Sequence, residues 1–166
     1  IFWTWHQVIP NGRKIGDMWT KENFVWDVAS VDTRYEEEKL ILEPLVYWKS
    51  PNLKNEDGTK IPFAKEKTTI TIHSCEGKRR TLDFTIRLHA LKNNLYIGGS
   101  DNKKGYGGFS ARIKLPDDIK FTAKYGTAKP KATAVPASPW MNFTGSFTKS
   151  NSQNGILILS HPDNPC

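Results

Sequence analysis

The chain has 166 residues and a formal net charge of +7. A chain of this length forms about one domain, and a domain of ~150 residues buries roughly 70% of its unfolded surface, so no metal or disulfide is needed to hold the fold together. No stretch approaches the roughly 18 apolar residues of a membrane helix, and the basic residues are scattered apart from 78–80 and 103–104, which argues against a membrane span and against a nucleic-acid site.

The first thirty residues predict two strands. Residues 2–8 alternate aromatic and polar side chains, which is typical of a strand, and the Pro-Asn-Gly of residues 10–12 ends it with a turn. Residues 15–19 are irregular, apolar and Gly-bearing, which suits a loop packed near the end of that strand. Residues 24–31 alternate again and predict the second strand.

A charged patch and a long strand follow. Residues 33–38 carry three consecutive glutamates, typical of a solvated strand edge or a turn. Residues 39–48 predict a strand, and Pro44 should place it at a sheet edge or bend it, because proline cannot donate to a ladder. Residues 50–67 are predicted to be a polar connection.

The middle of the chain gives the clearest pattern. Apolar and polar residues alternate strictly over residues 82–88 and again over 69–73, and a Gly-containing turn at 75–78 joins the two runs into a predicted hairpin. Residues 95–97 predict another strand. We expect the remaining strands to be built around the meander of residues 79–112, with its polar face as the working surface.

The last third of the chain predicts further short strands. These are residues 109–115, 120–125, 140–147 and 155–161, and residues 126–139 are a Pro- and Ala-rich flexible loop. No helix of ordinary length is predicted. The sequence therefore predicts an all-β, antiparallel β-sandwich, with residues 1–166 as a single domain.

No motif in the sequence indicates a metal or a cofactor. The four histidines lack metal-ligand spacing, and neither a nucleophile elbow nor a phosphate-binding loop is present. Residues 104–109 resemble the aromatic strand of an RNA-recognition motif, and residues 95–97 resemble its companion strand. In that fold a helix and another strand separate the two, whereas here only a short loop does. We therefore predict no cofactor and no nucleic-acid partner.

Aromatic side chains beside His, Asp and Arg on a β scaffold favour a carbohydrate site. Flat rings cover the apolar faces of sugars, and oriented polar groups bind the hydroxyls. Taken singly, each Trp is also explained as a core residue. The candidates for stacking are Trp3, Trp5, Trp19 and Tyr106, and those for polar contacts are His6, Asp17, Arg87, His89, Arg112 and His161.

Four blocks in order resemble the PmoA-like bacterial family of unknown function. They are residues 2–6 with 16–19, residues 83–90, residues 106–112, and residues 155–165 with the ending His161-Pro162-Asp163-Asn164-Pro165. In that family a His-His-Arg element precedes the first block and further chain follows the last. Both are missing here, so we expect this chain to be part of a longer protein.

The resemblance implies a fold similar to the galactose-mutarotase superfamily, in secreted or periplasmic bacterial proteins associated with sugar use. The methane oxygenase in the family's label does not fit, because a membrane-embedded subunit needs apolar spans. The positions that match the family's motifs are His6, Asp17, Trp19, Arg112, His161 and Asn164.

Two functions stay open at this point. The first is a carbohydrate-active hydrolase, lyase or epimerase, in which His6 or His161 works with Asp17 as general acid and base. Its substrate-binding residues would be Trp5, Trp19, His89, Tyr106, Arg112 and Asn164. The second is a non-catalytic carbohydrate-binding or structural β-sandwich. The oligomeric state and the pairing of Cys75 with Cys166 are also open.

Overall fold

The chain forms an all-β structure. The computed structural model describes residues 1–131, 133, 135–137, 139–148 and 153–164. These residues contain strands and turns and no helix, so none that could cross a membrane, and the prediction of an all-β antiparallel fold is confirmed. The chain divides into two compact units, an N-terminal unit of residues 4–99 and a C-terminal unit of residues 1–3 and 100–166.

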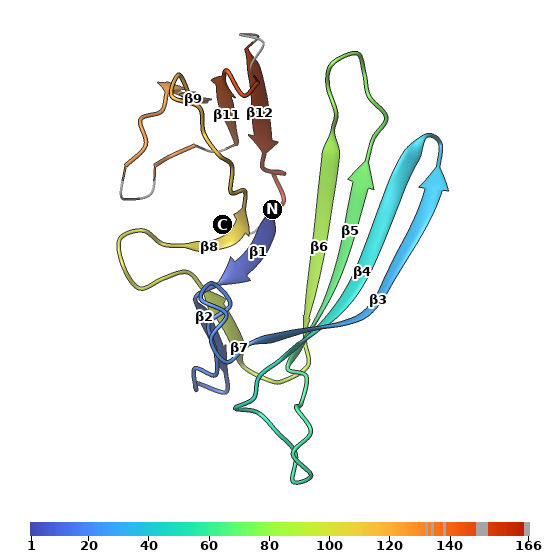
Figure 1. Cartoon of the computed structure of the whole chain (residues 1–166). Helices are drawn as coiled ribbons and strands as arrows, with labels where there is room; N and C mark the ends of the chain where they lie inside the picture. The colour runs from blue at the N-terminus through green and yellow to red at the C-terminus, as the bar shows by residue number, and fades with distance from the viewer. Residues whose placement is uncertain (132, 134, 138, 149–152, 165–166) are drawn as a thin grey trace. The chain divides into compact units, whose positions relative to one another are not determined.

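The N-terminal unit is built on a four-stranded antiparallel sheet in the order β3-β4-β5-β6 (Figure 1). Its strands are β3 (Val25–Glu36), β4 (Lys39–Lys49), β5 (Ala64–Ile72) and β6 (Leu82–Ala90). The predicted hairpin of residues 69–88 is therefore confirmed as β5 and β6, although the first four residues of β5, 64–67, were predicted to belong to the 50–67 connection.

The register of this sheet gathers apolar side chains in rows on one face. Leu40, Ile72 and Leu82 are direct partners across β4, β5 and β6. The next row on the same face is Leu42, Ile70 and Phe84. Because successive side chains alternate between faces, the strict alternation in the sequence fixes this register.

Pro44 lies in a central strand, so the prediction of an edge position is wrong. β4 pairs with β3 on one side and with β5 on the other, and Pro44 is the partner of Val31 in β3. On the other side, Leu42 pairs with Ile70 and Leu45 pairs with Lys67 in β5, and the two residues between Leu42 and Leu45 are unpaired in this ladder. The sheet thus accommodates a residue without an N–H by interrupting one ladder locally.

The core of the N-terminal unit is an aromatic cluster. Trp48 and Phe63 are fully buried, and Phe24 is 7% exposed. The Phe24 ring lies 5.5 Å from Trp48, 5.9 Å from Phe63 and 4.5 Å from Trp26, mostly edge to face. These rings lie at the end of the sheet where β3 and β5 begin and β4 ends.

The two short strands next to this core correct the predicted meander. β2 (Gln7–Pro10) pairs with β7 (Leu95–Gly98), so the strand after β6 leaves the large sheet rather than continuing it. This makes β6 an edge strand. Alternation identifies strands, but it does not say which strand a short one will pair with.

The C-terminal unit contains a second four-stranded sheet in the order β10-β9-β11-β12. Its strands are β9 (Lys120–Ala123), β10 (Gly126–Thr127), β11 (Trp140–Gly145) and β12 (Asn154–Leu159). The Phe121 and Phe143 rings pack edge to face at 5.3 Å. A separate two-stranded sheet pairs β1 (Phe2–Trp5) with β8 (Gly107–Ser110).

Most of the strands predicted in this unit are present but shorter. The predicted strand at 109–115 ends at Ser110, and the flexible loop predicted at 126–139 begins with β10 instead. Residues 132, 134 and 138 of that loop lie outside the described residues, as does Cys166. Cys75 is exposed in the turn between β5 and β6.

The three glutamates form the turn of the β3–β4 hairpin. Glu36 pairs with Lys39, so Glu37 and Glu38 are a two-residue loop, and both have positive φ angles of 45° and 63°. That is the backbone of a type I′ turn, which favours Asn-Gly. The interpretation of this patch as a solvated turn is confirmed.

Replacing this turn by its preferred residues should stabilise the protein. We expect Glu37→Asn with Glu38→Gly to raise the free energy of unfolding by about 1 kcal/mol or more, because a left-handed backbone penalises a side chain with Cβ. Urea unfolding measures it. Glu56→Asn, which removes an exposed charge without a positive φ angle, is the control. Unchanged or lower stability in the double variant would contradict the turn assignment.

Candidate functional site

The candidate site forms where the predicted strand of residues 2–8 breaks at His6, between β1 and β2. The chain turns at residues 11–12 and folds back over both strands. The N–H of Ile15 donates to the carbonyl of Val8 at 3.0 Å, and the N–H of Met18 donates to the carbonyl of Trp5 at 3.0 Å. The prediction of one continuous strand is wrong because this returning segment takes up hydrogen bonds on either side of His6.

The returning segment, residues 15–23, is tightly anchored; we call it the Asp17 loop. Ile15 is 4% exposed and Met18 is 1% exposed, so both side chains hold the loop in the core. The N–H of Asp17 donates to the carbonyl of Glu22 at 2.8 Å and closes the loop on itself. Gly16 runs so close to Asn23 that a Cβ there would lie 2.8 Å from the Asn23 carbonyl oxygen.

The Asp17 carboxylate joins this loop to His6. Its Oδ1 accepts hydrogen bonds from the backbone N–H groups of Trp19 at 2.9 Å and Thr20 at 3.1 Å. Its Oδ2 lies 2.8 Å from Nδ1 of His6. Both side chains are mostly buried, with 19% of His6 and 13% of Asp17 exposed.

The carboxylate of Asp17 is held in its charged form. Burial by itself raises the pKa of Asp17, but the hydrogen bond from His6, those from the N–H groups of Thr20 and Trp19, and the charge of His6 outweigh burial and lower the pKa below its ordinary value. The Nζ of Lys14 lies 4.0 Å from Oδ2. An ionised carboxylate only accepts hydrogen bonds, so Nδ1 of His6 must be the donor.

The Trp19 side chain completes the site. Its ring is stacked on the His6 imidazole, with centroids 5.5 Å apart and planes inclined by 23°. A histidine with its tautomer fixed by a carboxylate at Nδ1 presents a lone pair at Nε2, which suits it for proton transfer. The site therefore combines a group that can exchange protons with a half-buried indole.

The structure brings together three of the residues predicted from the sequence, namely His6, Asp17 and Trp19. Trp5 lies next to them in β1 and holds the Asp17 loop through its carbonyl. His89 is exposed in β6, where its partner across the hairpin is Lys65 in β5. Its predicted role in substrate binding stays a prediction.

The other predicted site residues belong to the C-terminal unit. The Arg112 guanidinium lies over the Phe2 ring at 5.7 Å, and the Lys104 ammonium lies over Tyr106 at 5.6 Å. His161 is 71% exposed in a turn, where its Nδ1 accepts from the N–H of Asp163 and its carbonyl accepts from the N–H of Asn164. The catalytic role of His161 and the binding roles of these residues stay predictions.

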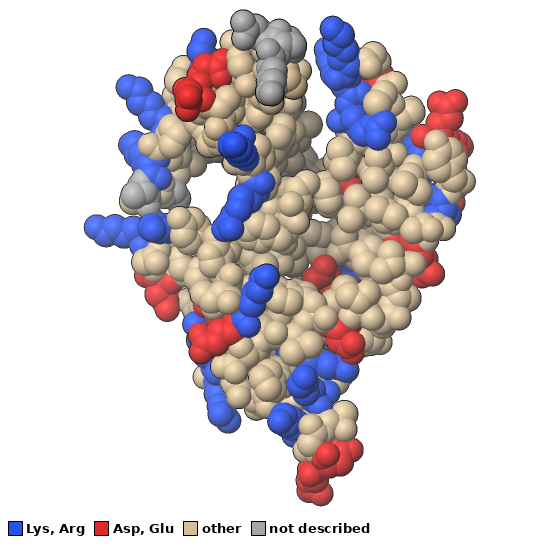
Figure 2. Space-filling model, in the orientation of Figure 1, with Lys and Arg blue, Asp and Glu red and all other residues tan. Residues whose placement is uncertain are grey.

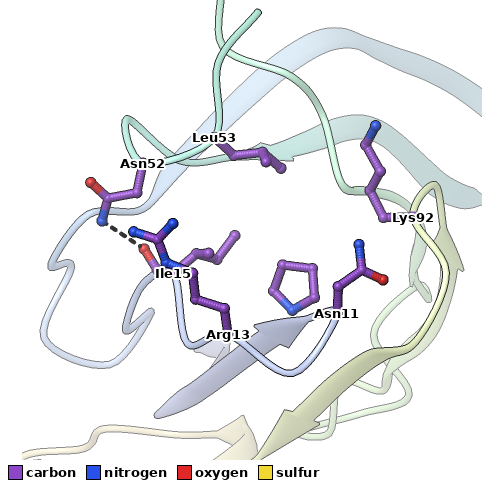
Figure 3. A pocket seen from close by; sticks show the side chains of 7 residues that line it. Asn11, Arg13, Ile15, Asn52, Leu53 and Lys92 are labelled. Carbon is purple, nitrogen blue, oxygen red and sulfur yellow. Dashed lines mark hydrogen bonds between the residues drawn. The ribbon is translucent and has the colours of Figure 1, made fainter.

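A hollow of about 310 Å³ in the N-terminal unit was not anticipated from the sequence (Figure 3). Residues 10–15, residues 52–53 and Lys92 contribute to its lining. Such a mixture of Pro, Asn, Arg, Ile, Leu and Lys carries no motif. The only available signal was the turn at Asn11 and Gly12, which predicts a chain reversal but no hollow.

The face seen in Figure 2 carries charged side chains of both signs. On the face seen in Figure 2, Lys and Arg are spread over several regions and interspersed with Asp and Glu. Among the residues that the structure describes, no group of three or more His, Cys, Asp or Glu lies close enough to hold a metal ion.

The close approach at Gly16 predicts a steric requirement. Gly16→Ala should lower the free energy of unfolding by about 1–3 kcal/mol, because the new methyl group would press on the Asn23 carbonyl and displace the Asp17 loop. Thermal unfolding followed by Trp fluorescence measures it. Gly98→Ala, whose Cβ would meet its nearest atom at 3.7 Å, should change stability much less. Equal effects of the two substitutions would contradict the packing described.

The lowered pKa of Asp17 predicts an acid-sensitive contribution to stability. The folded state favours the carboxylate, so the contribution is complete above the unfolded pKa, about 4, and is lost as the pH falls through the lower folded pKa. Asp17→Asn removes it while an amide oxygen can still accept from Trp19 and Thr20. The stability difference between wild type and this variant should therefore shrink from pH 6 to pH 2.5 in urea unfolding experiments. A difference that stays constant would show that Asp17 is not preferentially ionised in the folded protein.

Comparison with known proteins replaces the family resemblance inferred from the sequence. A search of curated proteins and a search of solved structures found no match. A family model matches residues 1–166, and its description is "Family of unknown function (DUF6807)". The resemblance to the PmoA-like family is therefore wrong, because the family model that matches the chain is a different one. The blocks that carried the resemblance are short, and short blocks do not identify a family. The chain belongs to DUF6807, a family of unknown function.

Proposed function

We propose that this protein acts on a carbohydrate at the site formed by His6, Asp17 and Trp19, with His6 as the group that moves a proton. The observation that carries the proposal is the 2.8 Å hydrogen bond between His6 Nδ1 and Asp17 Oδ2 beneath the stacked Trp19 ring. All three residues belong to the N-terminal unit.

The His6–Asp17 pair supports general acid–base chemistry. Because the carboxylate fixes the proton on Nδ1, a proton from a sugar hydroxyl or from water would be taken up at Nε2. The imidazolium that forms is stabilised by the adjacent carboxylate, which three hydrogen bonds hold in place. The same ring could return the proton to a leaving group.

Trp19 supports the choice of carbohydrate as substrate. Indole rings pack against the C–H faces of sugar rings, and that contact orients a substrate that offers few other apolar surfaces. The backbone N–H of Trp19 is fixed by Asp17, so the residue that would bind the sugar and the residue that would move the proton share one anchor. A substrate that packs across the edge of the indole and the imidazole stacked with it would contact both rings.

Two observations favour a second candidate, a non-catalytic carbohydrate-binding or structural module. The Asp17 carboxylate is occupied in joining the Asp17 loop to His6, which is also what a purely structural residue would do. In addition, His6, Asp17 and Trp19 do not line the hollow of Figure 3. They do not line a second, more open hollow either, which is formed by Val25, Asp27, Lys49 and residues 58–60. In a non-catalytic binding module, Trp19 would bind the sugar and His6 would only hold the Trp19 ring in position.

The chain contains a matched control for the His6–Asp17 pair. His73, which directly follows β5, and Asp83 in β6 are linked by a hydrogen bond of 2.7 Å, but Asp83 is 62% exposed. If the His6–Asp17 pair is catalytic, substitutions in it should reduce turnover strongly, whereas substitutions in the His73–Asp83 pair should leave turnover unchanged. A glycan array identifies the ligand, and a product assay on that ligand measures turnover.

We expect His6→Ala to reduce turnover by about 10²–10⁴-fold without unfolding the protein, because general acid–base catalysis contributes a factor of this size. Asp17→Asn should also reduce turnover, since an amide can present a donor to Nδ1 and favour the other tautomer. His73→Ala should leave turnover unchanged. A His6→Ala variant with normal stability and normal turnover would remove His6 as a catalytic group.

The same variants distinguish the second candidate. If the protein only binds sugar, Trp19→Ala should abolish binding on the array, His6→Ala should retain it, and no product should form from any bound glycan. If Trp19→Ala retains the binding of wild type, the indole does not hold the ligand and the site proposed here is wrong.

A further inference from the structure

The hollow of about 310 Å³ in the N-terminal unit combines an apolar floor with a basic and polar rim (Figure 3). Pro10, Ile15 and Leu53 supply the apolar surface, and the first two are buried. Arg13, Lys92, Asn11 and Asn52 supply the polar groups. A hollow of this size is at the lower end of small-molecule sites, which span about 300–1,000 Å³.

Three separate segments form the hollow, and hydrogen bonds hold each of them. The Ile15 carbonyl accepts from Nδ2 of Asn52 at 3.2 Å, shown as the dashed line in Figure 3, and from Oγ of the fully buried Ser50 at 3.0 Å. The N–H of Asn11 donates to the carbonyl of Asn94 at 3.1 Å. The lining is therefore preformed rather than assembled from loose loops.

The charge of the rim has one sign. No Asp or Glu lines the hollow, and within the described part of the chain neither Arg13 nor Lys92 lies within ion-pair distance of a carboxylate. In Figure 3, Arg13 lies on the same side as Asn52, and Lys92 lies on the same side as Asn11. Two cations on different segments thus border the same apolar floor.

This arrangement matches one class of ligand. Arginine presents a planar fork that fits a carboxylate, while a lysine provides a point charge and amides donate additional hydrogen bonds. The floor would accept a compact apolar body of a few carbon atoms, which inorganic anions lack. We propose that the hollow is a binding site for a small organic carboxylate, whose charge is balanced by Arg13 and Lys92 at the rim and whose body packs on Pro10, Ile15 and Leu53.

This site is independent of the proposed function at His6, because none of His6, Asp17 and Trp19 lines the hollow. Two sources could supply the ligand, a sugar acid or a simple carboxylic acid, and they share the chemistry that the hollow recognises. The experiment is a nitrogen-15 NMR titration of the full chain with glucuronate, cyclohexanecarboxylate, glucose and inorganic phosphate in parallel.

We expect at least one of the two carboxylates to shift the amide signals of residues 10–15 and 52–53 and to saturate, whereas glucose and phosphate do not. Arg13→Gln and Lys92→Gln should each weaken binding by about tenfold, the size expected for a charge-assisted hydrogen bond. Arg13→Lys should lose less affinity than Arg13→Gln, because lysine keeps the positive charge but lacks the planar guanidinium fork.

Lys78→Gln, which removes an exposed charge in the turn between β5 and β6, should leave the affinity unchanged, and the spectrum of each variant reports whether it is folded. Two results overturn the proposal. One is saturation by phosphate at the same strength as by the carboxylates, which would mean a non-selective basic surface. The other is the absence of saturable shifts with both carboxylates.

Discussion

The hydrogen bonds of a single carboxylate hold the candidate site together. Asp17 accepts from two backbone N–H groups of its own loop and from the His6 ring, and the Asp17 loop in turn covers the break between β1 and β2. Because an ionised carboxylate has no donor, these bonds set both the turn of the loop and the direction of the His6 hydrogen bond. The fold of this region and its chemistry therefore depend on the same group.

Local alternation in the sequence was sufficient to predict most of the strands, because a sheet with one apolar face imposes a period of two. It was not sufficient for long-range pairing. Pro44 lies in a central strand because one ladder is interrupted beside it, and β7 pairs with β2 rather than with β6. Both arrangements depend on which strands become neighbours in a sheet, and the local alternation of a single sequence does not state that.

The candidate site was predictable by residue type and not by geometry. His6, Asp17 and Trp19 were predicted because imidazole, carboxylate and indole suit sugar chemistry. The structure brings them together through the Asp17 loop, which passes close to its own end at Gly16. His161 was predicted on the same grounds, but it lies in an exposed turn of the C-terminal unit and hydrogen-bonds within that turn. Pro10, Ile15 and Leu53 around the hollow gave no signal at all, since such residues are usually part of a core.

The Asp17 carboxylate is mostly buried, whereas the carboxylate of the otherwise similar His73–Asp83 pair is 62% exposed. The proposed proton transfer at His6 depends on the tautomer that Asp17 imposes on the ring. The most direct test is the nitrogen-15 NMR signature of the His6 ring in labelled protein, at a pH at which the ring is neutral. The arrangement at Asp17 predicts a proton on Nδ1 and a lone pair on Nε2. A neutral ring with its proton on Nε2 would contradict it.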